Sequence, residues 1–162
     1  MVICVEKSMA PLTILLWISL IINGLFAGMC FDVATVKLPT RKRIGSLAYA
    51  HFARNNDLGN GLKVYPYFFV ASTLLSIIDG VVAYLNDYHK SASVALLIAA
   101  CTGAGCIFCT TQAAPIMWSL KKTPDHEKLL KEKLDRFAFW HSWRTLFQMS
   151  TFLLMCYALA IL

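Results

Sequence analysis

The chain has 162 residues, of which 58% are hydrophobic and 15% charged, and it carries a formal net charge of +6. Soluble globular chains contain roughly 45–50% apolar and about 25% charged residues, so this composition excludes a disordered, collagen-like or coiled-coil chain and argues against a soluble domain. Five of the six cysteines lie within or beside apolar runs, where they behave as small hydrophobic residues and not as a secreted disulfide framework. We therefore expect an integral membrane protein.

Four apolar segments are each long enough to cross about 30 Å of hydrocarbon, which takes roughly 20 helical residues. They run from about 10 to 31, 65 to 85, 92 to 113 and 137 to 162. The first segment is longer than the core of about 7–15 residues in a cleaved signal peptide, and its basic cluster follows it, so we interpret it as a membrane anchor. The predicted fold is all-α: a single domain, residues 1–162, that forms an integral membrane bundle of four transmembrane helices.

Lysine and arginine gather in two loops, 32–64 and 121–136, with six of them in each loop. The opposite side carries only Lys7 and Lys90, and Arg144 lies within the fourth span. Cytoplasmic loops of membrane proteins are enriched in Lys and Arg, so both basic loops are predicted to be cytoplasmic and both termini to lie outside. The positive charge is then expected to contact anionic lipid head groups of the bilayer, and we expect no nucleic-acid partner.

The long first loop is expected to contain a short helix over Ile44–Asn55. Four residues of this segment share one helical face: Ile44, Leu47, Ala48 and His51. Gly59–Gly61 is expected to break the helix, and Pro66 to open the second span. The helix would lie on the inner membrane surface or be tucked back under the bundle.

The second basic loop is predicted to be the start of the fourth helix. Thr123-Pro124-Asp125 has the pattern of an N-cap, a first-turn proline and an acidic first turn. Leu130, Leu134 and Phe137 form an apolar stripe that runs into the span, which predicts one helix of about 38 residues that extends into the cytoplasm. Its charges either form a solvated face or offer a docking surface to a partner.

Several polar side chains fall at the same depth, near the inner ends of three spans. His141, Arg144 and Gln148 share a face of the fourth span, and Asn23 and Gln112 lie at a matching depth in the first and third. A polar side chain inside a span costs several kcal/mol, so each needs a partner or a purpose. We predict a cavity open to the cytoplasm, with His141 exchanging a proton and Arg144 stabilising an anion as the catalytic pair. The candidate substrate-binding residues are Asn23, Gln112, Trp140, Gln148 and His51.

Other interpretations of these residues stay open. His141 and Arg144 could instead reach towards head groups while the tryptophans form an interfacial belt. Asp79, near the outer end of the second span, could handle protons or pin helices together. We interpret Gly24 with Gly28, and Gly103 with Gly105, as helix-packing positions.

No metal site or cofactor is expected. Cys106 and Cys109 have C-x-x-C spacing but no second pair, so packing is the favoured interpretation. A site built from His51, His141 and Asp32 is a weaker hypothesis. The sequence contains no phosphate-binding loop, dinucleotide fingerprint, H-E-x-x-H or haem-attachment motif.

The order and spacing of several motifs resemble the anthrone oxygenase-like family of small four-span membrane proteins. The resemblance covers nearly the whole chain and rests on these residues: Asn23-Gly24-Leu25-Phe26-Ala27-Gly28, Pro39, Gly61, Pro66, Ala114-Pro115-Ile116 and Trp140-His141-Ser142-Trp143-Arg144-Thr145. It implies a bundle of four helices and, as in characterised members, the oxidation of an anthrone to an anthraquinone with O₂. Such a substrate needs a base and a cation to form and hold its enolate, roles for which His141 and Arg144 are candidates. The electron-rich enolate could react with O₂ without metal or flavin.

Two functions of different classes follow. The first is a cofactor-independent oxygenase or oxidoreductase that acts on a small aromatic or lipophilic molecule. The alternative is a non-catalytic tetraspan scaffold or partner subunit that presents the charged 121–136 segment to a protein, or that assembles as a homo-oligomer or with a membrane partner. A proton-coupled carrier that uses Asp79 is the weakest hypothesis, because the chain has four spans and no internal repeat.

Overall fold

The computed structural model describes residues 2–85 and 89–162, with side chains described for 13–85 and 89–162. Within these ranges the chain is helical almost throughout and contains no strand. The elements are α1 (Val2–Asp32), η1 (Val33–Lys37), α2 (Leu38–Ile44), α3 (Ser46–Asn55), η2 (Asn56–Asn60), η3 (Gly61–Lys63), α4 (Tyr65–Leu85), α5 (Lys90–Ser119), η4 (Leu120–Lys122) and α6 (Glu127–Ile161), where η1 and η2 are π-helical and η3 and η4 are 3₁₀-helical. The predicted all-α class is confirmed.

Four of the described helical segments are long and apolar enough to cross a membrane, as the sequence predicted. They are Thr13–Ile44, Tyr65–Leu85, Lys90–Lys122 and Glu127–Ile161. At a rise of about 1.5 Å per residue, the 35 residues of α6 extend about 52 Å, well beyond a hydrocarbon layer of about 30 Å. The bundle is therefore taller than the membrane it would cross.

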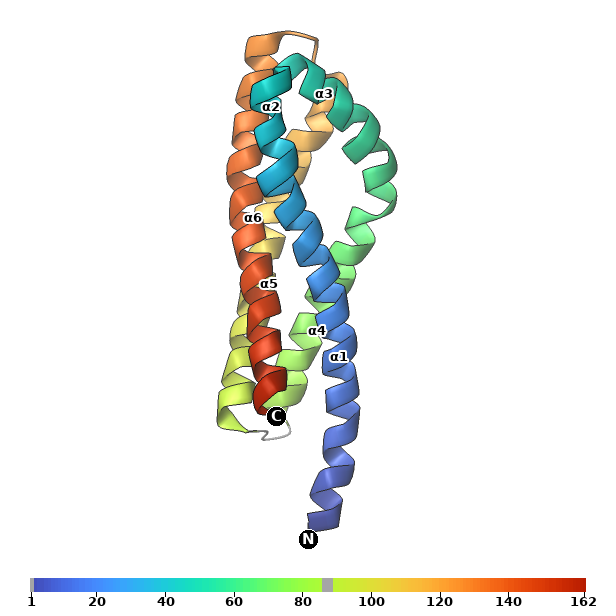
Figure 1. Ribbon diagram of the computed structural model, residues 1–162, viewed down its shortest axis with the longest axis vertical. Helices are drawn as coiled ribbons and strands as arrows, with labels where there is room; N and C mark the ends of the chain where they lie inside the picture. Colours follow the sequence, from blue (N-terminus) through green and yellow to red (C-terminus); the bar gives the residue numbers. More distant parts are fainter. Residues whose placement is uncertain (1, 86–88) are drawn as a thin grey trace.

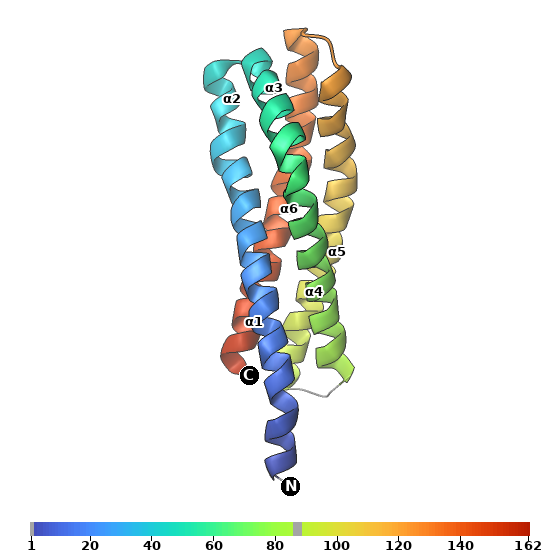
Figure 2. The same cartoon turned by 90° about the vertical axis from the view of Figure 1, so that its right-hand side faces the viewer.

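The helices run up and down in an elongated bundle (Figures 1 and 2). Both termini lie towards one end, and the turn at Gly45 and the turn between α5 and α6 lie at the other. We call the end with the two turns the basic end. Arg41, Lys42 and Arg43 precede the turn at Gly45, and Lys121 and Lys122 precede the turn between α5 and α6.

The segment 32–64, expected as a loop, is almost entirely helical. η1 and α2 prolong α1 to Ile44, the chain turns at Gly45 with φ +85°, and α3, η2 and η3 lead back to α4. The short helix expected over Ile44–Asn55 is present as α3, and it packs against α6. The expected break at Gly59–Gly61 is wrong, because the chain there stays helical in η2 and η3. A left-handed φ such as that of Gly45 is one that side chains with a Cβ rarely adopt, which places the reversal at this glycine.

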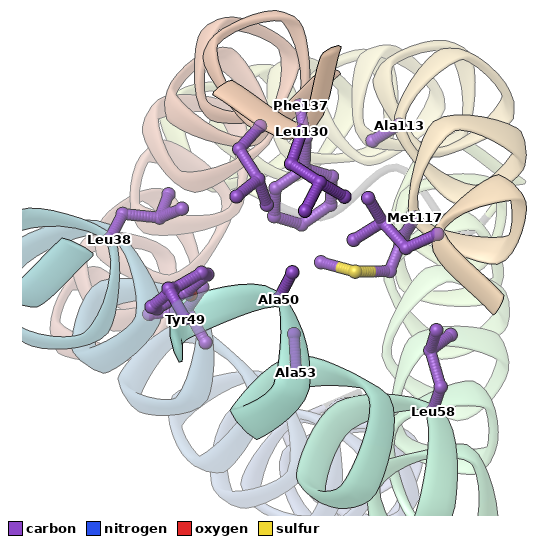
Figure 3. Packing of buried hydrophobic residues seen from close by; sticks show 12 residues of the cluster. Leu38, Tyr49, Ala50, Ala53, Leu58, Ala113, Met117, Leu130 and Phe137 are labelled. Atoms are coloured by element: carbon purple, nitrogen blue, oxygen red, sulfur yellow. The ribbon is translucent and has the colours of Figure 1, made fainter. Parts of the chain in front are cut away.

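The buried face of α3 is the opposite of the one that the apolar spacing suggested. Leu47, Ala48 and His51 are exposed, whereas Tyr49, Ala50 and Ala53 are buried. Figure 3 shows these three residues facing the side chains that project from α5 and α6. The apolar stripe predicted on α6, Leu130, Leu134 and Phe137, is buried in the same cluster. Alanine on α3 lets the larger side chains of α6 fill the space between the helices.

The start of α6 is three residues later than the cap pattern predicted. The helix begins at Glu127, and Thr123 is extended. Instead of capping the helix, Asp125 accepts a hydrogen bond from Arg54 Nη1 at 2.7 Å, and Arg54 also donates to the carbonyls of Leu120 and Thr123. The capping signal is thus used to fasten α3 to the α5–α6 turn. From Glu127 onward the predicted single long helix is present.

Glycines bring helices close together at some of the predicted positions. A Cβ at Gly24 would lie 2.9 Å from Phe152 Cε2, and one at Gly103 would lie 2.7 Å from Ser76 Oγ. Gly80, which the sequence had not singled out, lies against the backbone of Leu96. A Cβ at Gly28 would meet nothing within 4 Å, so Gly28 does not act with Gly24 as a packed pair within the described chain.

Candidate functional site

A cavity of about 300 Å³ lies among the four helices, at the basic end of their apolar segments. All four long helices and the segment between α1 and α4 contribute residues to its walls. They are formed by Phe26, Val33, Asp57, Leu58, Leu62, Tyr65, Pro66, Phe69, Thr110, Ala114, Met117, Trp118, Phe137 and Arg144. The lining is mostly apolar and rich in aromatic rings, with Arg144 and Asp57 as its two charged members. A small site of this composition suits an aromatic or lipophilic molecule that carries one polar group.

The exposure of the lining residues shows where the cavity opens. Pro66 on α4 and Trp118 on α5 are exposed, Trp118 by 56% of its surface. Phe26 on α1 and Phe137 on α6 are buried. The mouth therefore lies between α4 and α5, and α1 and α6 form the closed back of the cavity.

Arg144 lines the cavity from α6, and its guanidinium forms a hydrogen bond with His141, one turn earlier on the same helix. Arg144 Nη2 lies 2.6 Å from His141 Nδ1, and His141 Nε2 lies 3.1 Å from the carbonyl oxygen of Cys30. A carbonyl only accepts, so Nε2 carries the imidazole proton and Nδ1 accepts a hydrogen bond from the guanidinium. His141 is fully buried, and Phe137 stacks on its ring at 5.4 Å. The histidine is thereby fixed as a neutral acceptor that orients Arg144.

The charge of Arg144 has no carboxylate partner in direct contact within the described residues. Its Nε is buried and makes no hydrogen bond. A guanidinium has five N–H donors and binds carboxylate-like groups through two of them at once. Arg144 therefore gives the cavity wall a positive charge that no carboxylate contacts directly within the described residues, and this charge favours an anionic or enolate oxygen.

Asp57 lines the cavity from η2, on the side opposite α6, and belongs to a small polar cluster. Asn56 Nδ2 donates to Asp57 Oδ1 at 2.9 Å, Lys37 Nζ lies 4.0 Å from the same oxygen, and Lys37 donates to the Tyr65 hydroxyl at 3.1 Å. Burial raises the pKa of Asp57 above its ordinary value, against the opposing charges of Lys37 and Arg144. Sequence reasoning missed Asp57 because it lies between the helix expected over 44–55 and the break expected at Gly59–Gly61, where no packed structure was predicted. The available signal was a carboxylate beside Leu58 in a segment with six basic residues and one other acidic residue, Asp32.

Asn23 and Gln148 lie together, as predicted, but they bind each other and do not line the cavity. Gln148 Nε2 donates to Asn23 Oδ1 at 3.0 Å, and Asn23 Nδ2 donates to the carbonyls of Ser19 and Ser72 at 3.0 and 3.3 Å. Both side chains are almost completely buried. This network ties α1, α4 and α6 together inside the membrane-spanning region.

The remaining predicted site residues are placed elsewhere. Gln112 is half-buried on α5 and is not part of the cavity wall. The Trp140 ring packs edge-on against Phe108 at 5.8 Å, outside the cavity. His51 Nε2 lies 3.2 Å from Asp125 Oδ2 at the surface of the basic end.

The hypothetical metal site of His51, His141 and Asp32 does not form, since the described residues contain no cluster of three or more His, Cys, Asp or Glu side chains suited to a metal. Cys106 and Cys109 are buried free thiols, in keeping with packing. Asp79 is fully buried, and neither of its carboxyl oxygens makes a hydrogen bond. Of the seven residues predicted for the site, Arg144 alone lines the cavity and His141 supports it.

Comparison of the chain with protein families, with curated proteins and with solved structures found no match. The resemblance to the anthrone oxygenase-like family therefore stays a prediction from the motifs.

Proposed function

We propose that this protein is a multi-pass membrane oxidoreductase that binds a small, flat, lipophilic carbon acid in the Arg144 cavity and oxidises it with O₂. The observation that carries the proposal is a cavity of about 300 Å³ whose aromatic walls surround a guanidinium with no carboxylate partner in direct contact within the described residues. Aromatic walls favour a ring system, and the cation favours an oxygen that becomes negative. Anthrones combine both properties.

We place the basic end in the cytoplasm and both termini outside. The support is the concentration of Lys and Arg in 32–64 and 121–136, together with the general excess of these residues on the cytoplasmic side. The cavity then lies at the level of the inner leaflet. Its mouth between α4 and α5 would admit a lipophilic substrate from the bilayer.

The proposed reaction needs a proton acceptor and an oxyanion partner. Removal of one methylene proton from an anthrone leaves an enolate, whose oxygen Arg144 would hold. The enolate carbon bonds to O₂ and the resulting peroxide takes up a proton. Loss of the second methylene proton then forms the new carbonyl as the O–O bond breaks, and the outer oxygen leaves as water. His141, predicted as the base, is better suited to position Arg144, because its Nδ1 lone pair already accepts from the guanidinium.

The test is native mass spectrometry of gently solubilised protein with anthrone under anaerobic conditions, followed by O₂ consumption in air. Arg144→Ala should weaken binding by about 10-fold or more, since a hydrogen bond from a charged donor to the anthrone carbonyl contributes roughly 1.5–3 kcal/mol. Arg136→Ala is the matched control, because Arg136 lies on the same helix and is exposed. Wild-type protein that neither binds nor oxidises anthrone would refute the proposal.

The alternative function, a scaffold or partner subunit, draws on the exposed charges at the start of α6. Lys128, Lys131 and Arg136 are all exposed there. Reversing these three charges should abolish capture of a membrane or cytoplasmic partner if the scaffold hypothesis holds, and should leave anthrone oxidation unchanged if it does not.

A further inference from the structure

The cavity holds two opposite charges on facing elements. Arg144 lies on α6, and Asp57 lies on η2, which returns from the basic end towards α4. Their charges interact across the cavity, since Arg144 lowers the pKa of Asp57. No direct ion pair joins them in the described structure, so a molecule in the cavity would lie between a cation and a carboxylate.

Asp57 has the features of a general base more clearly than any other side chain in the cavity wall. It is 8% exposed, and one of its oxygens accepts from Asn56, which orients the carboxylate. Burial raises its pKa, and a carboxylate with a raised pKa is a stronger base at neutral pH than an exposed one. The other polar wall residues, Tyr65 and Thr110, carry neutral hydroxyls.

We propose that Asp57 is the proton acceptor for a carbon acid bound in the Arg144 cavity. The inference rests on the proposed function and deepens it. One carboxylate oxygen takes the proton from the acidic C–H bond, and the electron pair of that bond remains on the substrate as an enolate whose oxygen faces Arg144. The enolate carbon bonds to dioxygen, and Asp57 returns its proton to the outer oxygen of the resulting peroxide. Asp57 then removes the second methylene proton while the carbonyl forms and the O–O bond breaks, and the hydroxide that leaves takes this proton to become water. Base and oxyanion partner thus work from opposite walls.

Lys37 tunes this carboxylate without lining the cavity. Its ammonium lies between Asp57, Asp32 and the Tyr65 hydroxyl, at 4.0, 3.6 and 3.1 Å. Five charged or titratable groups interact electrostatically with Asp57 or lie beside its cluster. They are Asp32 at the end of α1, Lys37 in η1, Tyr49 in α3, Tyr65 in α4 and Arg144 in α6. Burial also raises the pKa of Tyr49, so its phenol stays neutral over the pH range in which Asp57 titrates.

The experiment measures proton abstraction apart from oxidation. Purified full-length protein is mixed with anthrone in D₂O without O₂, and deuterium entry into the methylene group is followed by nuclear magnetic resonance against the uncatalysed rate. Wild-type protein should accelerate the exchange, and Asp57→Asn should lower the catalysed rate by roughly 10²-fold or more, the usual contribution of a general base. Asp57→Asn should still retain anthrone in native mass spectrometry, whereas Arg144→Ala should lose it.

Two further measurements guard against a folding defect. Asp135→Asn is the matched control, because Asp135 pairs with Arg41 and neither lines this cavity nor acts on Asp57, and it should exchange at the wild-type rate. Asp57→Glu keeps a carboxylate and should restore part of the exchange. In wild-type protein alone, the exchange rate should rise with pH through a midpoint above the ordinary value for Asp.

The possible failures are distinguishable. If wild-type protein binds and oxidises anthrone while Asp57→Asn exchanges and oxidises it equally well, Asp57 is not the base and the proposed function stands. A flat pH profile in wild-type protein would overturn the inference in the same way. If wild-type protein neither binds anthrone nor exchanges its protons, the proposed function and the inference both fall.

Discussion

Replacing Asn23 or Gln148 by leucine tests whether these two buried amides hold the bundle together or serve a ligand. In the structure Gln148 Nε2 donates to Asn23 Oδ1 at 3.0 Å, and their exposures are 1% and 0%. Asn23→Leu leaves the Gln148 amide without this partner and removes the donor from two carbonyls as well. Gln148→Leu leaves Asn23 Oδ1 without its donor. The two changes should therefore be strongly non-additive.

The expected magnitudes follow from the burial. Each single variant should lose about 1–3 kcal/mol, the cost of leaving a buried polar group unsatisfied. The double variant should lose less than the sum, with a coupling energy of about 0.6–1.7 kcal/mol, the range found for hydrogen bonds between membrane helices. Gln112→Leu is the control, since Gln112 is half-buried and the described structure gives it no hydrogen bond; its effect should stay within about 0.5 kcal/mol.

The assay is a double-mutant cycle on reversible unfolding in mixed micelles, with anthrone retention measured on the same four proteins. Neither residue lines the cavity, so each variant that folds should bind anthrone as wild type does. A coupling energy below about 0.3 kcal/mol would refute the structural role, because distant and independent sites already add to within that margin. Loss of binding at unchanged stability would instead restore the substrate-binding role expected from the sequence.

Two further predictions concern packing and pH. Gly80→Ala would place a Cβ 3.1 Å from the Leu96 carbonyl oxygen and should lower the free energy of unfolding by about 1–3 kcal/mol in the same assay. Gly28→Ala is the control, because its Cβ would meet nothing within 4 Å, and it should leave the free energy of unfolding nearly unchanged. Equal effects of the two substitutions would contradict the packing. Hydrogen bonding from Arg54 lowers the pKa of Asp125, so this carboxylate stabilises the fold above the ordinary Asp pKa of about 3.9 and the contribution disappears as pH falls through the lowered value. Thermal unfolding followed from neutral to acidic pH should show this loss in wild type and not in Asp125→Asn.

The spans could be predicted because hydrocarbon thickness acts directly on composition. A stretch of about 20 apolar residues has few alternatives to a membrane helix, and all four appear where expected. Their ends could not be predicted in the same way. Backbone hydrogen bonding continues past the hydrocarbon wherever tertiary packing stabilises it, which carries α1 on through α2 to Ile44 and α5 to Ser119.

Arg144 could be found from the sequence because a charge about 10 Å inside a span is costly enough to need an explanation. The sequence also brought Asn23 and Gln148 to one depth correctly. It could not tell whether converging amides face each other or a ligand, because that depends on which donors and acceptors meet across the helices. The sequence could indicate that Asp57 is unusual but could not place it in the cavity wall, since its position depends on η2 and on the packing of α3 against α6.

The polar groups at this depth divide according to how completely they satisfy one another. Asn23 and Gln148 meet as donor and acceptor, and His141 accepts from Arg144 while it donates to Cys30. In each of those contacts the donor and the acceptor satisfy one another. Arg144 is different, because its Nε makes no hydrogen bond and no carboxylate contacts its guanidinium among the described residues. In a low-dielectric setting an unpaired charge is costly unless a ligand oxygen pairs with it. Asp57 is the buried carboxylate in the wall of the same cavity, and under the proposed function it would take the proton while Arg144 holds the oxygen that becomes negative.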